Sequence, residues 1–208
     1  MIVAESIFEG HSEGMGRVAM AFKGLYTLDE FAQDVSTTLD VWGDSVNAVL
    51  NMGHLVQRFI AENDHDSLWT IGDPAAISSG LPGRKLYDDA DQRFRLLLAE
   101  YAPNTATAVH SHEGWVVIGI IKGSERYTSW RRVDDGLDPA HANLEIVQDH
   151  HIMEGEFGYL YNQPFNVHRQ SAEGQGALEL VLMKGRGQRL NHIDVETGDC
   201  SEPVELNR

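Results

Sequence analysis

From about residue 66 onward, short β-rich runs follow one another, separated by turn residues and without helical periodicity between them. The clearest runs are 93–101, 114–121, 125–132, 142–148 and 177–183. Asp88 to Asp91, Lys122-Gly123 and Gly185 to Gly187 supply turn residues between or after them. Strands without crossover helices must pair mainly in antiparallel fashion. The pattern therefore predicts an antiparallel barrel or sandwich rather than a parallel α/β sheet.

The chain before this region has helical patterning. Thr27-Leu28-Asp29-Glu30 has the form of a capping box. Apolar residues follow at helical spacing, at Leu28, Phe31, Val35, Leu39 and Trp42. A second helix is expected after Asp44-Ser45, with a kink or interruption near Gly53. We therefore expect a helical segment over residues 1–65, packed on a barrel domain over residues 66–208.

Composition narrows the classes of partner and of metal site. The chain has 16 Lys and Arg against 32 Asp and Glu, so nucleic acid is not an expected partner. No run of about 20 apolar residues is present, and the first nine residues lack the basic start of a secretory signal, so we expect a cytoplasmic protein without membrane contact. A single cysteine, Cys200, forbids an internal disulfide and a thiolate-rich metal site. Any metal site must use nitrogen and oxygen ligands, for which ten histidines are available.

His110-Ser111-His112 precedes the apolar run 114–121. Along a strand, residues i and i+2 face the same side, so both imidazoles would point one way. If that side is the barrel interior, two neutral nitrogens converge as a divalent transition metal requires, and His168 after Pro164 is the best-placed third ligand. The alternative interpretation is a solvated strand end, because two histidines one residue apart also occur by chance.

Two segments resemble a known superfamily. HSHEGWVVIGIIKG resembles the first motif of the cupins and PFNVH the second, which supplies the last metal ligand. The usual cupin glutamate position holds Val116, which leaves a set of three histidines. That set, with Trp115 and Gly123, is most similar to the thiol dioxygenases, the group of cysteine dioxygenase and 3-mercaptopropionate dioxygenase. The resemblance implies a mostly β cupin double-stranded β-helix, a jelly-roll barrel with an N-terminal helical layer.

The resemblance extends to a substrate-binding segment and fails at one strand. The residues around Arg84 are similar to the family segment in which an arginine binds the substrate carboxylate. In the family, a serine, a histidine and a tyrosine alternate along a late strand, where this chain has Glu179, Val181 and Met183. The cysteine that crosslinks to tyrosine in animal cysteine dioxygenases is also absent. The missing polar relay puts thiol chemistry in question.

Four further residues are candidates for catalytic roles, each with an alternative. Arg84 could bind a substrate carboxylate or could balance nearby surface aspartates. Tyr159 and Tyr161 would share a face and could direct a hydroxyl toward oxygen or substrate, although packing of their rings in the core is the interpretation that we favour. Glu179 lies in an apolar strand, so it would be a base or a fourth ligand if it faces the interior, and a solvated residue if it faces outward.

The leading hypothesis is a mononuclear non-haem iron(II) dioxygenase with His110, His112 and His168 as ligands, in which another divalent transition metal could replace iron. Its substrates would be O₂ and a small carboxylate-bearing compound, with a thiol acid as first candidate. One alternative is a three-histidine dioxygenase that cleaves a carbon–carbon bond of a diketone or hydroxylated aromatic. The other is a non-catalytic cupin that binds a metal or ligand. The chain could also pair as a homodimer.

Overall fold

The computed structural model describes residues 26–70, 72–77, 81–185, 189–201 and 204–205. The helices are α2 (Leu28–Trp42), α3 (Val46–Glu62) and α4 (His65–Leu68). The strands are β1 (Asp73–Ile77), β2 (Leu81–Asp88), β3 (Phe94–Tyr101), β4 (His110–Ser111), β5 (Val116–Arg132), β6 (Leu144–Met153), β7 (Phe157–Leu160), β8 (Val167–Lys184), β9 (Arg189–His192) and β10 (Val204–Glu205). The part of the predicted helical segment before residue 26 lies outside the described residues.

The two long helices begin where the sequence predicts. The Thr27 hydroxyl accepts a hydrogen bond from the Glu30 amide, and the Glu30 carboxylate accepts one from the Thr27 amide, which completes the capping box. Ser45 caps α3 in the same way through the Ala48 amide. The predicted break near Gly53 is wrong, because α3 continues through it to Glu62. Gly53 is needed for packing instead, since a Cβ atom there would lie 2.1 Å from the ring of Phe157.

Within the described residues, the strands form one ten-stranded sheet, in the order β1-β2-β3-β8-β4-β9-β10, with β5 joined to β8 and carrying β6 and β7. Each of these pairings is antiparallel. The long strand β8 pairs with β3, β4 and β5 and so connects the two halves of the barrel. The predicted mostly β architecture with an N-terminal helical layer is confirmed.

The strand boundaries differ from the prediction at three places, one of which is β6, since it ends at Met153 rather than at residue 148. Runs 114–121 and 125–132 form one strand, β5, because Lys122-Gly123 makes a bulge rather than a turn. Gly123 has φ +85°, a conformation that glycine adopts without strain. Run 177–183 is the second half of β8, which begins ten residues earlier, at Val167.

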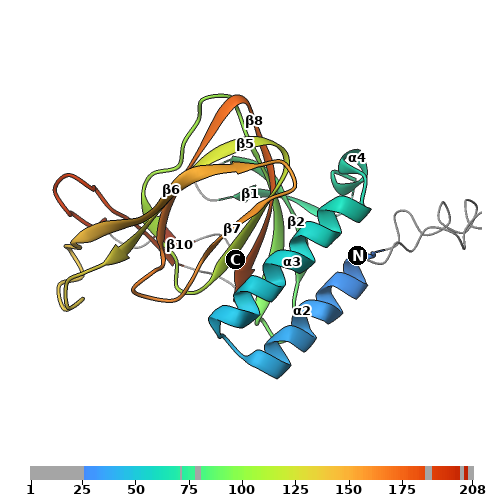
Figure 1. Ribbon diagram of the computed structural model, residues 1–208, viewed down its shortest axis with the longest axis horizontal. Coiled ribbons are helices and arrows are strands. Elements are labelled where there is room, and N and C mark those ends of the chain that lie inside the picture. The colour runs from blue at the N-terminus through green and yellow to red at the C-terminus, as the bar shows by residue number, and fades with distance from the viewer. Residues whose placement is uncertain (1–25, 71, 78–80, 186–188, 202–203, 206–208) are drawn as a thin grey trace, which may run out of the picture.

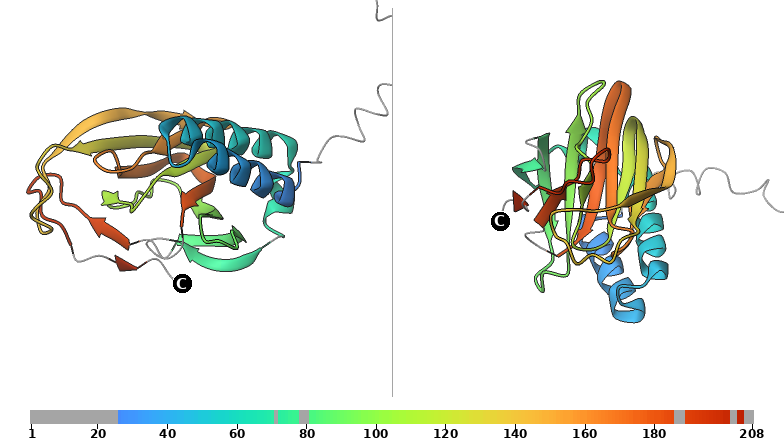
Figure 2. Two further views of the ribbon diagram at one scale, coloured as in Figure 1. Left: turned by 90° about the horizontal axis from the view of Figure 1, so that it is seen from below. Right: turned by 90° about the vertical axis from the view of Figure 1, so that its left-hand side faces the viewer.

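The sheet has an outer face covered by helices and an inner face that fills the barrel. Helices α2 and α3 lie side by side along one side of the barrel (Figures 1 and 2). Their buried residues pack on alternate residues of the sheet, among them Leu96, Leu98, Val117, Leu180 and Leu182. The intervening residues form a second core inside the barrel, among them Leu97, Ala99, Ile118, Val181 and Met183. No helix in the described part of the chain is long and apolar enough to cross a membrane.

Candidate metal centre

The three predicted ligands meet inside the barrel. In the antiparallel pairing of β4 with β8, His110 lies directly opposite His168, so both side chains project from the same face. His112 follows two residues after His110 and projects to that face as well. All three are buried, with 3%, 4% and 1% of the surface of His110, His112 and His168 exposed.

The ring nitrogens converge on one point. The Nε2 atoms are 3.1 Å apart between His110 and His112, 3.0 Å between His112 and His168, and 2.9 Å between His168 and His110. Three nitrogens bound at right angles to one ion at about 2.1 Å would be roughly 3.0 Å apart. The observed triangle therefore fits one face of an octahedral metal ion, and the predicted ligand cluster is present.

The protonation of the site also suits a metal. Burial lowers the pKa of His110 to about 4, and burial together with the neighbouring imidazoles lowers that of His168. His110 Nδ1 lies 2.9 Å from the carbonyl oxygen of Ala108, so the proton of a neutral ring belongs on Nδ1. The Nε2 lone pair of His110 is then directed toward the centre of the triangle. Neutral imidazoles of this kind bind zinc, copper, iron and nickel.

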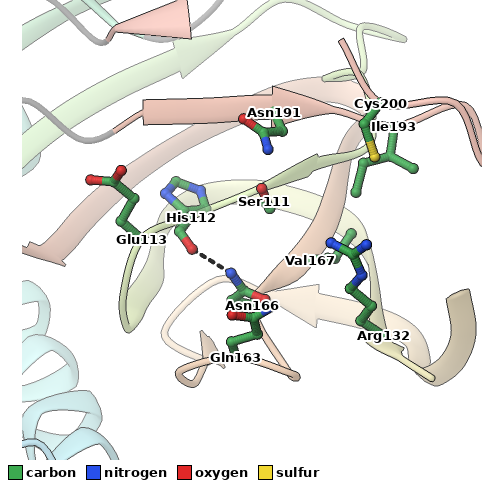
Figure 3. Close-up of a pocket in the computed structure, with 10 residues that line it drawn as sticks. All are labelled: Ser111, His112, Glu113, Arg132, Gln163, Asn166, Val167, Asn191, Ile193 and Cys200. Atoms are coloured by element: carbon green, nitrogen blue, oxygen red, sulfur yellow. Dashed lines mark hydrogen bonds between the residues drawn. The ribbon is translucent and has the colours of Figure 1, made fainter. Parts of the chain in front are cut away.

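The loop before β8 fixes His112. The His112 amide donates to the carbonyl oxygen of Asn166 over 2.9 Å, and the Asn166 side-chain amide donates back to the His112 carbonyl oxygen (Figure 3). This reciprocal pair ties the ligand after β4 to the segment that leads into His168. The two chain segments that carry the ligands are thereby held in register.

A polar pocket open to solvent has one of the three ligands, His112, in its lining. It has a volume of about 640 Å³, and His112 is one of its walls (Figure 3). The other lining residues are Ser111, Glu113, Arg132, Gln163, Asn166, Val167, Asn191, Ile193 and Cys200. Arg132 is the one basic residue in this lining. Its Nε donates to Asp134, and its Nη2 donates to the carbonyl oxygens of Asp138 and His141.

The structure does not place Arg84 beside the histidines. Arg84 lies opposite Leu98 in the β2–β3 pair, and Leu98 belongs to the core against the helices. Residues directly opposite each other share a face, so Arg84 lies on the outer face of the sheet. Its Nη2 donates to the carbonyl oxygen of Gly72. The structure gives its predicted role as a carboxylate clamp no support.

Tyr159 and Tyr161 also lie on the helical side. Tyr159 is opposite Val117, and both tyrosines pack against the core that the helices cover. The Tyr161 hydroxyl donates to the carbonyl oxygen of Asp44 over 2.8 Å. This placement agrees with the packing interpretation of the two rings and not with contact to oxygen or substrate.

Glu179 faces the barrel interior, as one of its two predicted orientations requires. It is 1% exposed and accepts a hydrogen bond of 2.6 Å from Gln170. It is not a fourth ligand, because the cluster of ligand atoms found in the described residues contains only the three imidazoles. Sequence reasoning missed its neighbour Glu125, which is completely buried on β5. The signal for Glu125 in the sequence is its position two residues before Tyr127, which places both side chains on the same face of the strand.

Comparison with known proteins gives similarity of fold only. No model of a known protein family and no curated protein matches the sequence. Among solved structures, an RmlC-like cupin from Shewanella frigidimarina is 14% identical over 59% of this chain and 92% of that chain, with a TM-score of 0.41. An RmlC-like cupin from Ralstonia eutropha is 14% identical over 67% and 83%, with a TM-score of 0.43. KdgF from Halomonas sp. is 11% identical over 55% and 86%, with a TM-score of 0.41. Likeness at this level says nothing of activity.

Proposed function

We propose that the protein is a metal-dependent oxygenase, with one divalent metal ion, in the first instance iron(II), held by His110, His112 and His168. The observation that carries the proposal is the triangle of buried Nε2 atoms 2.9 to 3.1 Å apart. Because the protein supplies three neutral ligands, an iron(II) ion bound there would offer adjacent open positions to O₂ and to an anionic substrate.

The pocket favours a small polar substrate. Its walls carry hydroxyl and amide groups beside His112, so a bound molecule would replace water by hydrogen bonds to Ser111, Gln163, Asn166 or Asn191. Arg132 is the one basic residue in this pocket, and since its Nε and Nη2 already donate to Asp134 and to two carbonyl oxygens, its Nη1 donors are the ones that could bind a carboxylate. The hydrogen bonds to Asp134 and to two carbonyl oxygens hold the guanidinium in place. We therefore assign substrate anchoring to Arg132 and take a thiol acid as the first candidate substrate.

One observation favours the second candidate reaction, cleavage of a carbon–carbon bond in a diketone or hydroxylated aromatic. The inner face of the late strand carries Glu179, Val181 and Met183, all of them buried. This face is mostly apolar and lacks the serine, histidine and tyrosine that the thiol dioxygenases use there. A substrate that needs no such relay would suit it better.

Oxygen uptake by protein purified without a histidine tag and loaded with iron(II) separates these alternatives. A thiol panel that includes cysteine and 3-mercaptopropionate should give substrate-dependent uptake and a sulfinic acid product. Uptake with diketones alone, accompanied by a carbon-cleaved product, would select the second reaction. Protein that binds iron and consumes no oxygen with either panel would leave the non-catalytic cupin. His112→Ala should lose both metal and uptake, whereas His150→Ala, an exposed histidine on β6, should retain both.

A further inference from the structure

Two glutamates are buried together inside the barrel. Glu125 on β5 is 0% exposed and Glu179 on β8 is 1% exposed. The side chain of Gln170 joins them, since its Nε2 donates to Glu179 Oε2 over 2.6 Å and to Glu125 Oε2 over 3.2 Å. None of the ion pairs between described residues includes either carboxyl group. Within the described part of the chain, the two carboxyl groups therefore lie close together without an ion pair to a basic side chain.

Such a pair cannot carry two charges cheaply. Burial disfavours ionisation of each group, and a carboxylate raises the pKa of a second carboxyl group in contact with it. Burial raises the pKa of Glu125, and burial together with Glu125 raises the pKa of Glu179 well above its usual range. The titratable groups that face the pair are Tyr101 from β3 and Tyr127 from β5, and burial raises the pKa of both hydroxyls. Because both tyrosines stay neutral, neither of them compensates a negative charge on the two glutamates.

The pair lies next to the metal ligands along two strands. Gln170 follows His168 by two residues on the same face of β8. On β5, Tyr127 follows Glu125 by two residues, and its ring centroid is 5.6 Å from that of His168. Among the described residues, neither the Tyr127 hydroxyl nor Glu125 Oε1 has a hydrogen-bond partner, although both are buried. One layer of side chains thus separates the acid pair from the histidines.

We propose that Glu125 and Glu179 share one proton and provide the counter-charge of the metal centre. The inference rests on the proposed metal binding, because three neutral imidazoles bring no negative charge to a divalent ion. With its single proton the pair carries one negative charge. A divalent ion at the histidines favours loss of that proton to solvent, which leaves the pair with two negative charges and balances the ion.

Proton release on metal binding tests this coupling. Calorimetric titration with Zn²⁺, in buffers of different ionisation enthalpy at pH 7, counts the protons released per ion bound. We expect wild-type protein to release more than Glu179→Gln, by up to one proton per ion. Glu100→Gln, a replacement of an exposed glutamate on β3, should match wild type. Protons lost by metal-bound water are common to all three proteins. Equal release by wild type and Glu179→Gln would overturn the proposal.

The protonation state can also be measured without a variant. In metal-free protein with ¹³C-labelled glutamate, carboxyl shifts followed from pH 4 to pH 9 should show one group that stays protonated at pH 7. Two ionised carboxylates at pH 7 would overturn the shared proton. So would a second ion per chain that remains in His112→Ala and is lost in Glu179→Gln, because the pair would then bind a cation. If Zn²⁺ does not bind at all, the metal proposal fails while this titration still decides the acid pair.

Discussion

At the level of single side chains, the structure and the family resemblance point to different arginines as the residue that binds a substrate carboxylate. Arg132 lines the pocket beside His112, whereas Arg84 lies on the outer face of β2. Arg132→Ala should raise KM for a carboxylate substrate by about 10- to 100-fold, the loss expected for a hydrogen bond to a charged group. Metal content should stay the same. Arg84→Ala should leave KM unchanged, and a rise in KM in this variant alone would return the clamp to Arg84.

The buried imidazoles also make a prediction about pH. The unfolded chain takes up protons on histidine near pH 6.5, while folded His110 stays neutral down to a pKa of about 4. A histidine with a lowered folded-state pKa destabilises the fold as pH falls below 6.5, and the penalty stops growing below about 4. At pH 5, the metal-free protein should have lost about 2 kcal/mol of unfolding free energy on account of His110.

Urea unfolding of metal-free protein at pH 7.5 and pH 5 measures this loss. His110→Gln should lose less stability between the two pH values than wild type does, because glutamine takes up no proton. The exposed replacement His150→Ala should follow the wild-type profile. Parallel profiles for wild type and His110→Gln would show that the ring is not held neutral.

Among the secondary-structure elements, α3 can pack against Phe157 only because residue 53 is a glycine. Alanine normally stabilises a helix interior relative to glycine by about 1 kcal/mol. At Gly53 we expect the opposite, a loss of about 1 to 3 kcal/mol, because the new Cβ atom would overlap the ring of Phe157 on β7. Thermal or urea unfolding of Gly53→Ala measures this. Phe157→Leu in the same chain should recover part of the loss, and a stabilised Gly53→Ala would contradict the packing described.

Capping and apolar spacing were sufficient to predict the long helices, because both are patterns of residues close together in the chain. The antiparallel sheet could be predicted because no helical pattern separates the closely spaced β-rich runs. Such patterns were insufficient at Lys122-Gly123, where a bulge and a turn call for the same residues. His110 and His112 could be predicted because His-x-His places two side chains on one face of a strand, and His168 because it follows the turn at Pro164. Arg132 and Glu125 could not, because only the pairing of distant strands decides which residues line the pocket and the barrel interior.

At the scale of the whole molecule, the free energy of unfolding depends on the contacts that attach the helical layer to the barrel. Asp44, between α2 and α3, accepts a hydrogen bond of 3.1 Å from the indole of buried Trp115 and also binds Lys184. Asp44→Ala would leave a buried indole N–H without its acceptor, so we expect a loss of about 1 to 3 kcal/mol in urea unfolding. Asp44→Asn, which keeps an acceptor oxygen, should lose less. Equal losses in the two variants would show that the lost charge of Asp44, and not the unpaired indole N–H of Trp115, causes the destabilisation.

The proposed metal centre consists of three imidazoles that bind one ion, and X-ray absorption spectroscopy combined with elemental analysis tests this directly. Untagged protein loaded with iron(II) should hold one ion per chain, with scattering from three imidazole nitrogens at about 2.1 Å. His168→Ala should hold none. Protein that takes up no divalent metal, or a His168→Ala variant that keeps the full complement of metal with unchanged scattering, would contradict binding of the metal by these three histidines.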